Sequence, residues 1–63
     1  MITWYQSEDL VTGVLEGRPV VQIERLEIGL WQVIPRSPIR AKAFVNLGHA
    51  KRWASRQIDL VTR

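Results

Sequence analysis

The last third of the chain, residues 44–61, repeats apolar positions at the spacing of an amphipathic helix. At about 100° per residue, small and apolar side chains form one stripe along a predicted helix over 47–61, with Trp53 and Leu60 on its flank. Asn46 is a favourable N-cap, and we expect the apolar Val45 before it to pack against the first turn. The stripe consists of Leu47, Ala50, Ala54, Ile58 and Val61.

The residues before this helix form short runs rich in β-branched and aromatic side chains, which are typical of strands. Val21 and Ile23 alternate with polar neighbours, and Trp31 and Val33 share one face of a later run. Residues 39–43 alternate once more, and they fit either a further short strand or an extended lead into the helix. The other predicted strands are 2–5, 10–16, 20–25 and 30–34.

Glycines mark the turns between these runs. Gly17-Arg18 has the form of a type II′ hairpin turn, and Gly29 is the expected left-handed residue of a turn that begins at Leu26. Gly13 interrupts a strand-like run and therefore indicates a bulge or a close contact.

Together these elements predict one small α+β domain over residues 1–63. An antiparallel meander of three to four strands carries one C-terminal amphipathic helix across one face, in the order βββα or ββββα. A single helix covers only one face of such a sheet. The other face, which Leu30 or Ile34 would line, is then a candidate protein-binding surface.

The small size of the chain limits its stability. A domain of 63 residues buries only about 60% of the surface that its unfolded chain exposes. Cysteine is absent, so disulfides and thiolate metal sites are excluded, and a lone His49 predicts no metal site. Self-association is the remaining way to add buried area, and a homodimer and a monomer fit the length equally well.

The charge balance favours anionic partners. Nine Lys and Arg residues oppose six acids, which gives a net charge of +3, and most of the cations are Arg. Arg presents a planar fork of donors that suits phosphate and carboxylate groups. The N-terminal residues lack the pattern of a signal peptide, and no stretch is long enough to cross a bilayer, so we expect a cytoplasmic protein without membrane contact.

The outer face of the predicted helix carries the densest group of cations. His49, Arg52 and Arg56 share this face, where they could follow a row of phosphates. The same pattern fits an ordinary solvated face, because Asp59 lies three residues after Arg56 and offsets part of the charge.

A second basic group, Arg36, Arg40 and Lys42, precedes the helix. It fits a loop that touches a phosphate backbone. It also fits an ordinary polar loop with an edge strand that charged side chains protect from aggregation, and this second interpretation is slightly favoured. Nucleic-acid binding is favoured if this group and the helix face lie on the same side of the molecule.

The aromatic residues suggest a second kind of surface. Trp31 and Trp53 are most simply core residues. Trp4 and Tyr5 fit an anchor for a partner protein or for a second copy of the chain. We find no nucleophile, general base or phosphate-binding loop in the sequence, so we expect a protein that is not an enzyme and needs no cofactor.

The stretch 44–54 has the pattern of a junction where a sheet passes into a helix, and the residues of note are Phe44, Leu47, Ala50 and Lys51, together with Trp31 of an earlier predicted strand. In this respect the chain resembles small domains of phages and mobile elements, including the arm-type DNA-binding domains of integrases. The resemblance covers about a third of the chain and implies three strands followed by a helix, together with DNA binding.

Two functional hypotheses follow from the sequence. In the first, the chain is a non-enzymatic regulatory module that binds nucleic acid, or a complex that handles nucleic acid, through its Arg-rich face. In the second, it is an inhibitor or adaptor of the kind that phages and plasmids direct against host machinery. That protein would bind an acidic protein surface through Trp4, Tyr5 and the uncovered sheet face.

Overall fold

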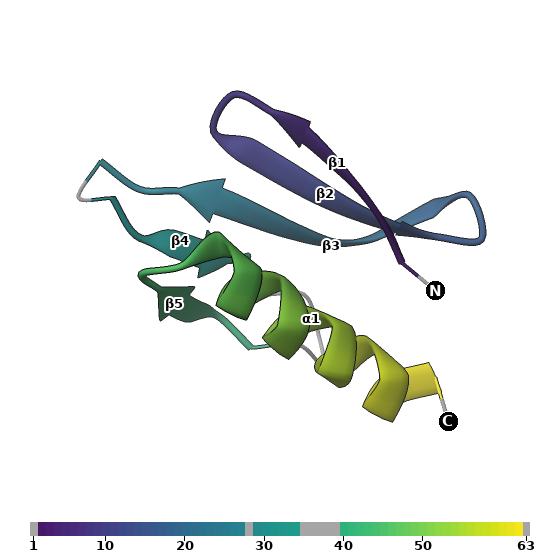
Figure 1. Cartoon of the computed structure of the whole chain (residues 1–63). Coiled ribbons are helices and arrows are strands. Elements are labelled where there is room, and N and C mark those ends of the chain that lie inside the picture. The colour runs from purple at the N-terminus through teal and green to yellow at the C-terminus, as the bar shows by residue number, and fades with distance from the viewer. Residues whose placement is uncertain (1, 28, 35–39, 63) are drawn as a thin grey trace.

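The computed structural model describes residues 2–27, 29–34 and 40–62, the side chains of residues 61 and 62 excepted. One antiparallel sheet, whose strands follow one another in sequence order, carries one C-terminal helix on a single face (Figure 1). The α+β class, the meander and the position of the helix are therefore as predicted. The elements are β1 (Thr3–Ser7), β2 (Leu10–Leu15), β3 (Arg18–Arg25), β4 (Trp31–Val33), β5 (Lys42–Phe44) and α1 (Leu47–Thr62).

The sheet has five strands, so the predicted count of three to four is too low. The segment for which two interpretations were open does form a strand, and Phe44 of this strand pairs with Trp31 of β4. It covers Lys42–Phe44 rather than 39–43, and Ile39 lies outside the described residues. At the other edge β1 continues to Ser7, because Gln6 and Ser7 still pair with β2.

The core lies between the sheet and α1. Alternate residues of the central strands, Val11, Ile23 and Val33, are fully buried, as expected from the alternation of the sequence. Ala50 and Ala54 of α1 are also fully buried. Their small side chains let the helix backbone approach the sheet closely, which a larger residue at either position would prevent.

The start of the helix is capped by Asn46. Its side-chain oxygen Oδ1 accepts a hydrogen bond of 3.2 Å from the backbone N–H of His49, which satisfies a donor that the helix itself cannot. Val45, in contrast, is 82% exposed, and the prediction that it packs on the first turn is wrong. Phe44 packs on the helix instead, with its ring centroid 5.8 Å from that of Trp53 in the second turn.

Leu60 does not belong to the buried flank of the helix. Its side chain is 58% exposed, although the sequence placed it beside Trp53. On a helical wheel Leu60 lies between Trp53 and Arg56, roughly 120° from the centre of the buried stripe, so its side chain can point to solvent. The side chain of Val61, the last predicted member of the stripe, lies outside the described residues.

The hairpin turn between β2 and β3 differs from the predicted one. Leu15 pairs with Arg18, so the two central residues are Glu16 and Gly17 rather than Gly17 and Arg18. Both have positive φ, 52° and 78°, which defines a type I′ turn instead of type II′. The register rather than the glycine alone decides the turn type, because the strands place Gly17 at the second central position.

The structure confirms both interpretations of Gly13. The register of β2 and β3 shifts between Gly13 and Val14, and the extra residue of this bulge is Val20. A Cβ atom on Gly13 would also lie only 2.8 Å from the ring of Trp4. Gly29, with φ of 82°, is the predicted left-handed residue of the next turn.

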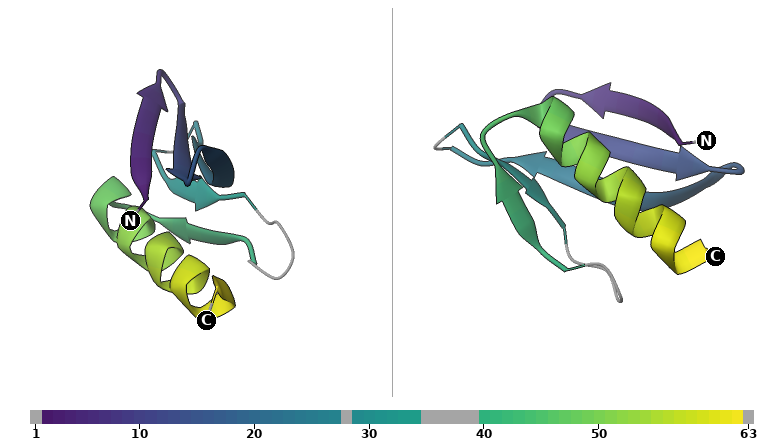
Figure 2. Two further views of the ribbon diagram at one scale, coloured as in Figure 1. Left: turned by 90° about the vertical axis from the view of Figure 1, so that its right-hand side faces the viewer. Right: turned by 60° about the horizontal axis from the view of Figure 1, so that its bottom comes forward.

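The sheet is twisted, as Figure 2 shows: its two edge strands, β1 and β5, run in clearly different directions. α1 lies against β3, β4 and β5. The start of β1 and the end of α1 lie at the same end of the molecule (Figures 1 and 2). No helix in the described residues is both long and apolar enough to span a membrane.

Candidate nucleic-acid interface

The outer side of α1 carries the predicted cations, and we call His49, Arg52 and Arg56 the basic helix face. All three side chains are exposed, and they lie opposite the buried Ala50 and Ala54. Arg52 and Arg56 stand one helical turn apart, so their guanidinium groups can reach neighbouring anionic groups of one ligand. Asp59 is exposed as well and adds a carboxylate one turn beyond Arg56, as the sequence predicted.

Lys42 lies on the helix side of the sheet, opposite in direction to its neighbour Ala43. Lys42 pairs with the buried Val33 and therefore points to the covered face, whereas Ala43 is exposed on the other face. Its ammonium nitrogen lies 5.4 Å from the ring centroids of both Phe44 and Trp53. The strand tolerates a lysine on the covered face because β5 is an edge strand, where the long Lys side chain can cover two rings and keep its charge in water.

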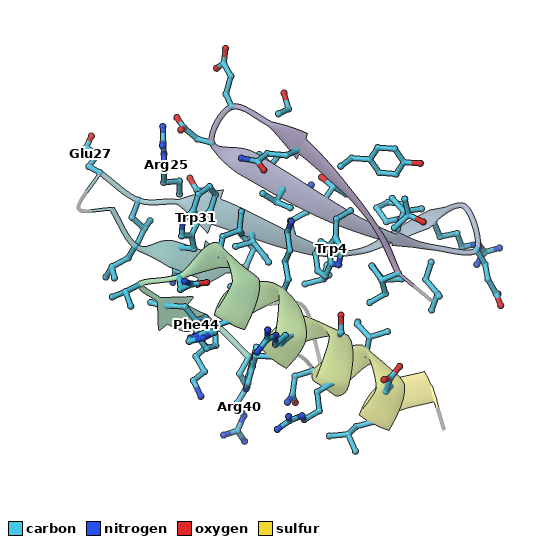
Figure 3. All side chains as sticks on the ribbon, in the orientation of Figure 1. Trp4, Arg25, Glu27, Trp31, Arg40 and Phe44 are labelled. Atoms are coloured by element: carbon cyan, nitrogen blue, oxygen red, sulfur yellow. The ribbon has the colours of Figure 1, made fainter. Side chains whose placement is uncertain are left out.

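Lys51 occupies the corresponding position on the opposite flank of α1. Its ammonium nitrogen lies 5.8 Å from the centroid of the Trp4 ring, which Figure 3 shows in the space between β1 and α1. Both lysines of the chain are therefore packed on aromatic rings, one on each side of the basic helix face. Neither pairing could be predicted from the sequence, because each joins residues that only the tertiary structure brings together.

The second predicted basic group is only partly described. Arg40 is exposed directly before β5, and its side chain points away from the sheet in Figure 3. Lys42 contacts Trp53 of the helix and so belongs to the same side of the molecule as the basic helix face. Arg36 lies outside the described residues.

The open face of the sheet has a different character. In the five described strands the register places Thr3, Tyr5 and Ser7 of β1 on this face, together with their partners on the strands that follow. Glu24 is the charged residue among them, and none is Lys or Arg. The cations of the described strands and helix therefore lie on the helix side or at strand ends. The remaining members of the open face are Leu10, Thr12, Val14, Pro19, Gln22, Glu24, Gln32 and Ala43.

The predicted protein-interface residues do not form one surface. Tyr5 is 61% exposed on the open face, whereas Trp4 points to the covered face and packs against the core. Adjacent residues of a strand point to opposite sides, so these two aromatic rings do not belong to one face of the sheet. Leu30 and Ile34 flank β4 and are each half-buried.

A further charged contact, not predicted from the sequence, joins the β1–β2 turn to the end of β3. The guanidinium of Arg25 lies 2.5 Å from the carboxylate of Asp9 and 5.9 Å from the centroid of the Trp31 ring (Figure 3). Both charged side chains are more than half exposed, so this pair stabilises the fold by at most about 1 kcal/mol. It neutralises Arg25 and leaves that residue outside the basic helix face.

The surface of the described residues has a shallow hollow beside the Asp9–Arg25 pair and another elsewhere. One, of about 290 Å³, is lined by residues around Arg25 and Gly29, and the other, of about 280 Å³, lies between β1 and α1. The hollow between β1 and α1 is lined by Ile2, Trp4, Leu15, Ser55, Ile58 and Asp59.

Within the described part of the chain, no three His, Asp or Glu side chains are grouped so that they could hold a metal ion.

No family model, curated protein or solved structure matches this chain. The similarity to integrase arm domains therefore rests on the sequence pattern of the strand-to-helix junction alone.

Proposed function

We propose that this chain is a small non-enzymatic regulatory module that binds nucleic acid, directly or within a nucleic-acid-handling complex, through the basic helix face. The observation that carries this proposal is the one-sided distribution of charge. His49, Arg52 and Arg56 are exposed on the outer side of α1, whereas the open face of the described sheet offers no cation. Among the described residues, a polyanion would thus be attracted to the helix side of the sheet more strongly than to its open face.

The spacing of the two arginines suits a phosphate backbone. Arg52 and Arg56 are separated by four residues, or about 6 Å along the helix axis. Each guanidinium can donate two parallel hydrogen bonds to phosphate oxygens. Lys42 and Arg40, which lie beside the helix on β5 and just before it, would extend the contact along the ligand.

Contacts of this kind position a protein without reading bases. We therefore expect binding that depends steeply on salt and weakly on sequence, with any selectivity supplied by a second copy of the chain or by another component.

Salt-titrated fluorescence polarisation with labelled duplex and single-stranded oligonucleotides tests the proposal. Loss of two phosphate contacts in an R52A/R56A variant should lower the slope of log K against log salt by about 1.8 on duplex DNA and about 1.4 on a single strand. Affinity at low salt should fall by about tenfold or more.

Arg18 provides the matched control, because it is exposed at the β2–β3 hairpin, away from the basic helix face. The Arg18→Ala and Arg56→Ala variants lose the same charge. Only the second should weaken binding substantially. Equal losses in both variants, or an unchanged slope in the R52A/R56A variant, would contradict the proposal.

The exposed Tyr5 favours one other candidate, a protein-binding inhibitor or adaptor. Its ring is 61% exposed on the open face, where Leu10 is exposed as well, and a partner could bury both. A pull-down from nuclease-treated lysate separates the candidates. The adaptor is favoured if a protein identified in this way binds the purified chain. That protein should also bind the R52A/R56A variant but not a Tyr5→Ala variant.

A further inference from the structure

The two edges of the sheet are protected to different degrees. β5 has three residues, one of which is Lys42, and a charged side chain on an edge opposes pairing with another strand. β1 has five residues, four of them exposed, and contains neither a charge nor a proline. Its Thr, Trp and Tyr residues also favour the extended conformation. β1 is therefore the edge at which a further strand can add.

The hydrogen-bonding pattern shows which groups of β1 are free to pair. The backbone N–H of Arg25 donates to the carbonyl of Asp9 at 2.8 Å, next to the pair Leu10–Glu24. In an antiparallel ladder this geometry directs the N–H and C=O of Leu10 away from β3 and toward Ser7 of β1. Because the pattern alternates, Ser7, Tyr5 and Thr3 bond to β2, whereas the N–H and C=O of Trp4 and Gln6 point outward.

We propose that β1 pairs antiparallel with β1 of a second copy, with Tyr5 opposite Tyr5 across a two-fold axis. In this register Trp4 of each copy lies opposite Gln6 of the other, and each such pair exchanges two hydrogen bonds. The two five-stranded sheets would join into one continuous sheet. Both copies of α1 would then lie on the same side.

A second copy suits this edge better than an unrelated strand. Tyr5 is 61% exposed, and at a pair that is not hydrogen-bonded its ring packs directly on the ring of its symmetry mate. Glu8, the nearest charge in the sequence, falls opposite Ile2 rather than opposite another acid. A chain of 63 residues also gains the buried area that its single small core lacks.

The helix leaves room for this arrangement. Cα atoms of α1 come within 8 Å of those of β3, β4 and β5 but, among the described residues, not of those of β1. A second sheet can thus approach the β1 edge without meeting the helix backbone. The interface does not depend on the ligand of the basic helix face, and its failure would leave that proposal untouched.

Because the chain has no cysteine, single cysteine variants test the register directly. In the proposed pairing the two Cα atoms at position 5 are about 4.5 Å apart, which a disulfide can bridge. The two Cα atoms at position 3, and likewise those at position 7, are about 13 Å apart, which it cannot.

Mild oxidation of nuclease-treated protein should therefore convert the Tyr5→Cys variant to a covalent dimer. The Thr3→Cys and Ser7→Cys variants should each remain monomeric on a non-reducing gel, yet cross-link with one another when mixed. Equal cross-linking of all three variants, or none in the Tyr5→Cys variant, would overturn the register.

Sedimentation equilibrium measures dimerisation without any cysteine substitution. The unmodified chain should sediment as a dimer at micromolar concentration, and a Gln6→Pro variant as a monomer. Proline there removes only an N–H that points away from β2, so its circular dichroism spectrum should match that of the unmodified chain. An unmodified chain that stays monomeric up to about 1 mM would overturn the proposal, since that concentration corresponds to only about 4 kcal/mol of association free energy.

Discussion

The indole ring of Trp4 lies directly on the backbone of Gly13, its partner across the β1–β2 pair. A Cβ atom on Gly13 would be 2.8 Å from Cζ3 of Trp4 and 2.8 Å from Cγ1 of Val21. Real Cβ atoms do not approach other atoms so closely. The glycine in the middle of β2 is therefore what allows the first strand to lay its largest side chain over the sheet.

From this contact we expect a Gly13→Ala variant to lose about 1–3 kcal/mol of unfolding free energy, because the added methyl group must displace a ring or a strand. Urea denaturation followed by tryptophan fluorescence measures the loss. In a Trp4→Leu background the same substitution should cost clearly less, since the ring is gone. An equal cost in both backgrounds would show that Trp4 is not the obstacle.

The type I′ turn predicts a stabilising substitution. Glu16 has φ of 52°, a conformation that costs most side chains about 1 kcal/mol and that Asn tolerates. Glu16→Asn creates the favoured Asn-Gly sequence and should raise the unfolding free energy by about 0.5–1 kcal/mol. Glu27→Asn removes the same charge from a turn residue without positive φ. A similar gain in unfolding free energy in that control would show that the loss of negative charge, and not the turn conformation, causes the effect.

The helix cap can be removed without touching the core. Asn46→Ala eliminates the acceptor for the N–H of His49 and should lower the unfolding free energy by about 1 kcal/mol. Val45→Ala, one residue earlier, should change it by less than about 0.5 kcal/mol, because that side chain is 82% exposed. Thermal melts monitored at 222 nm compare the two, and similar shifts would contradict the assignment of the cap.

The close approach of helix and sheet predicts a large penalty at Ala54. This residue is fully buried, and Ala54→Leu should cost about 1–3 kcal/mol of unfolding free energy through overpacking. Ala43→Leu introduces the same side chain at an exposed position of β5 and should have little effect. Chemical denaturation of both variants provides the test. Equal stability would mean that the helix does not lie close against the sheet.

Lys42 and Arg40 should differ in what their loss affects. Lys42→Ala removes an ammonium group that lies over two rings and should lower the unfolding free energy by about 0.5–1 kcal/mol. Arg40→Ala should leave stability unchanged, because this side chain is exposed before β5. Under the proposed function both variants should weaken oligonucleotide binding. Thermal melts and polarisation titrations of the same samples separate the two effects.

Much of the candidate site was predictable because it is helical. The spacing of residues on a helix fixes which side chains share a face, so the exposed group His49, Arg52 and Arg56 followed from the sequence. The short β5 was harder to predict. The alternation over 39–43 did not show which set of side chains faces the core, and in the folded chain Lys42 and Phe44 take the inner positions. The pairing with β4 decides the orientation of so short a strand, and pairing is not a local property.

The sequence by itself determined the elements that depend on neighbouring residues. The amphipathic helix, its Asn46 cap, the alternation of Val21 and Ile23 and the place of most turns all arise from local periodicity and backbone preference. Only the tertiary structure decided the strand count, the position of the hairpin turn and the packing of Lys51 on Trp4. These features depend on strand register and on contacts between distant segments. Their energies are set by which residues meet in the folded chain, not by which residues are adjacent in it.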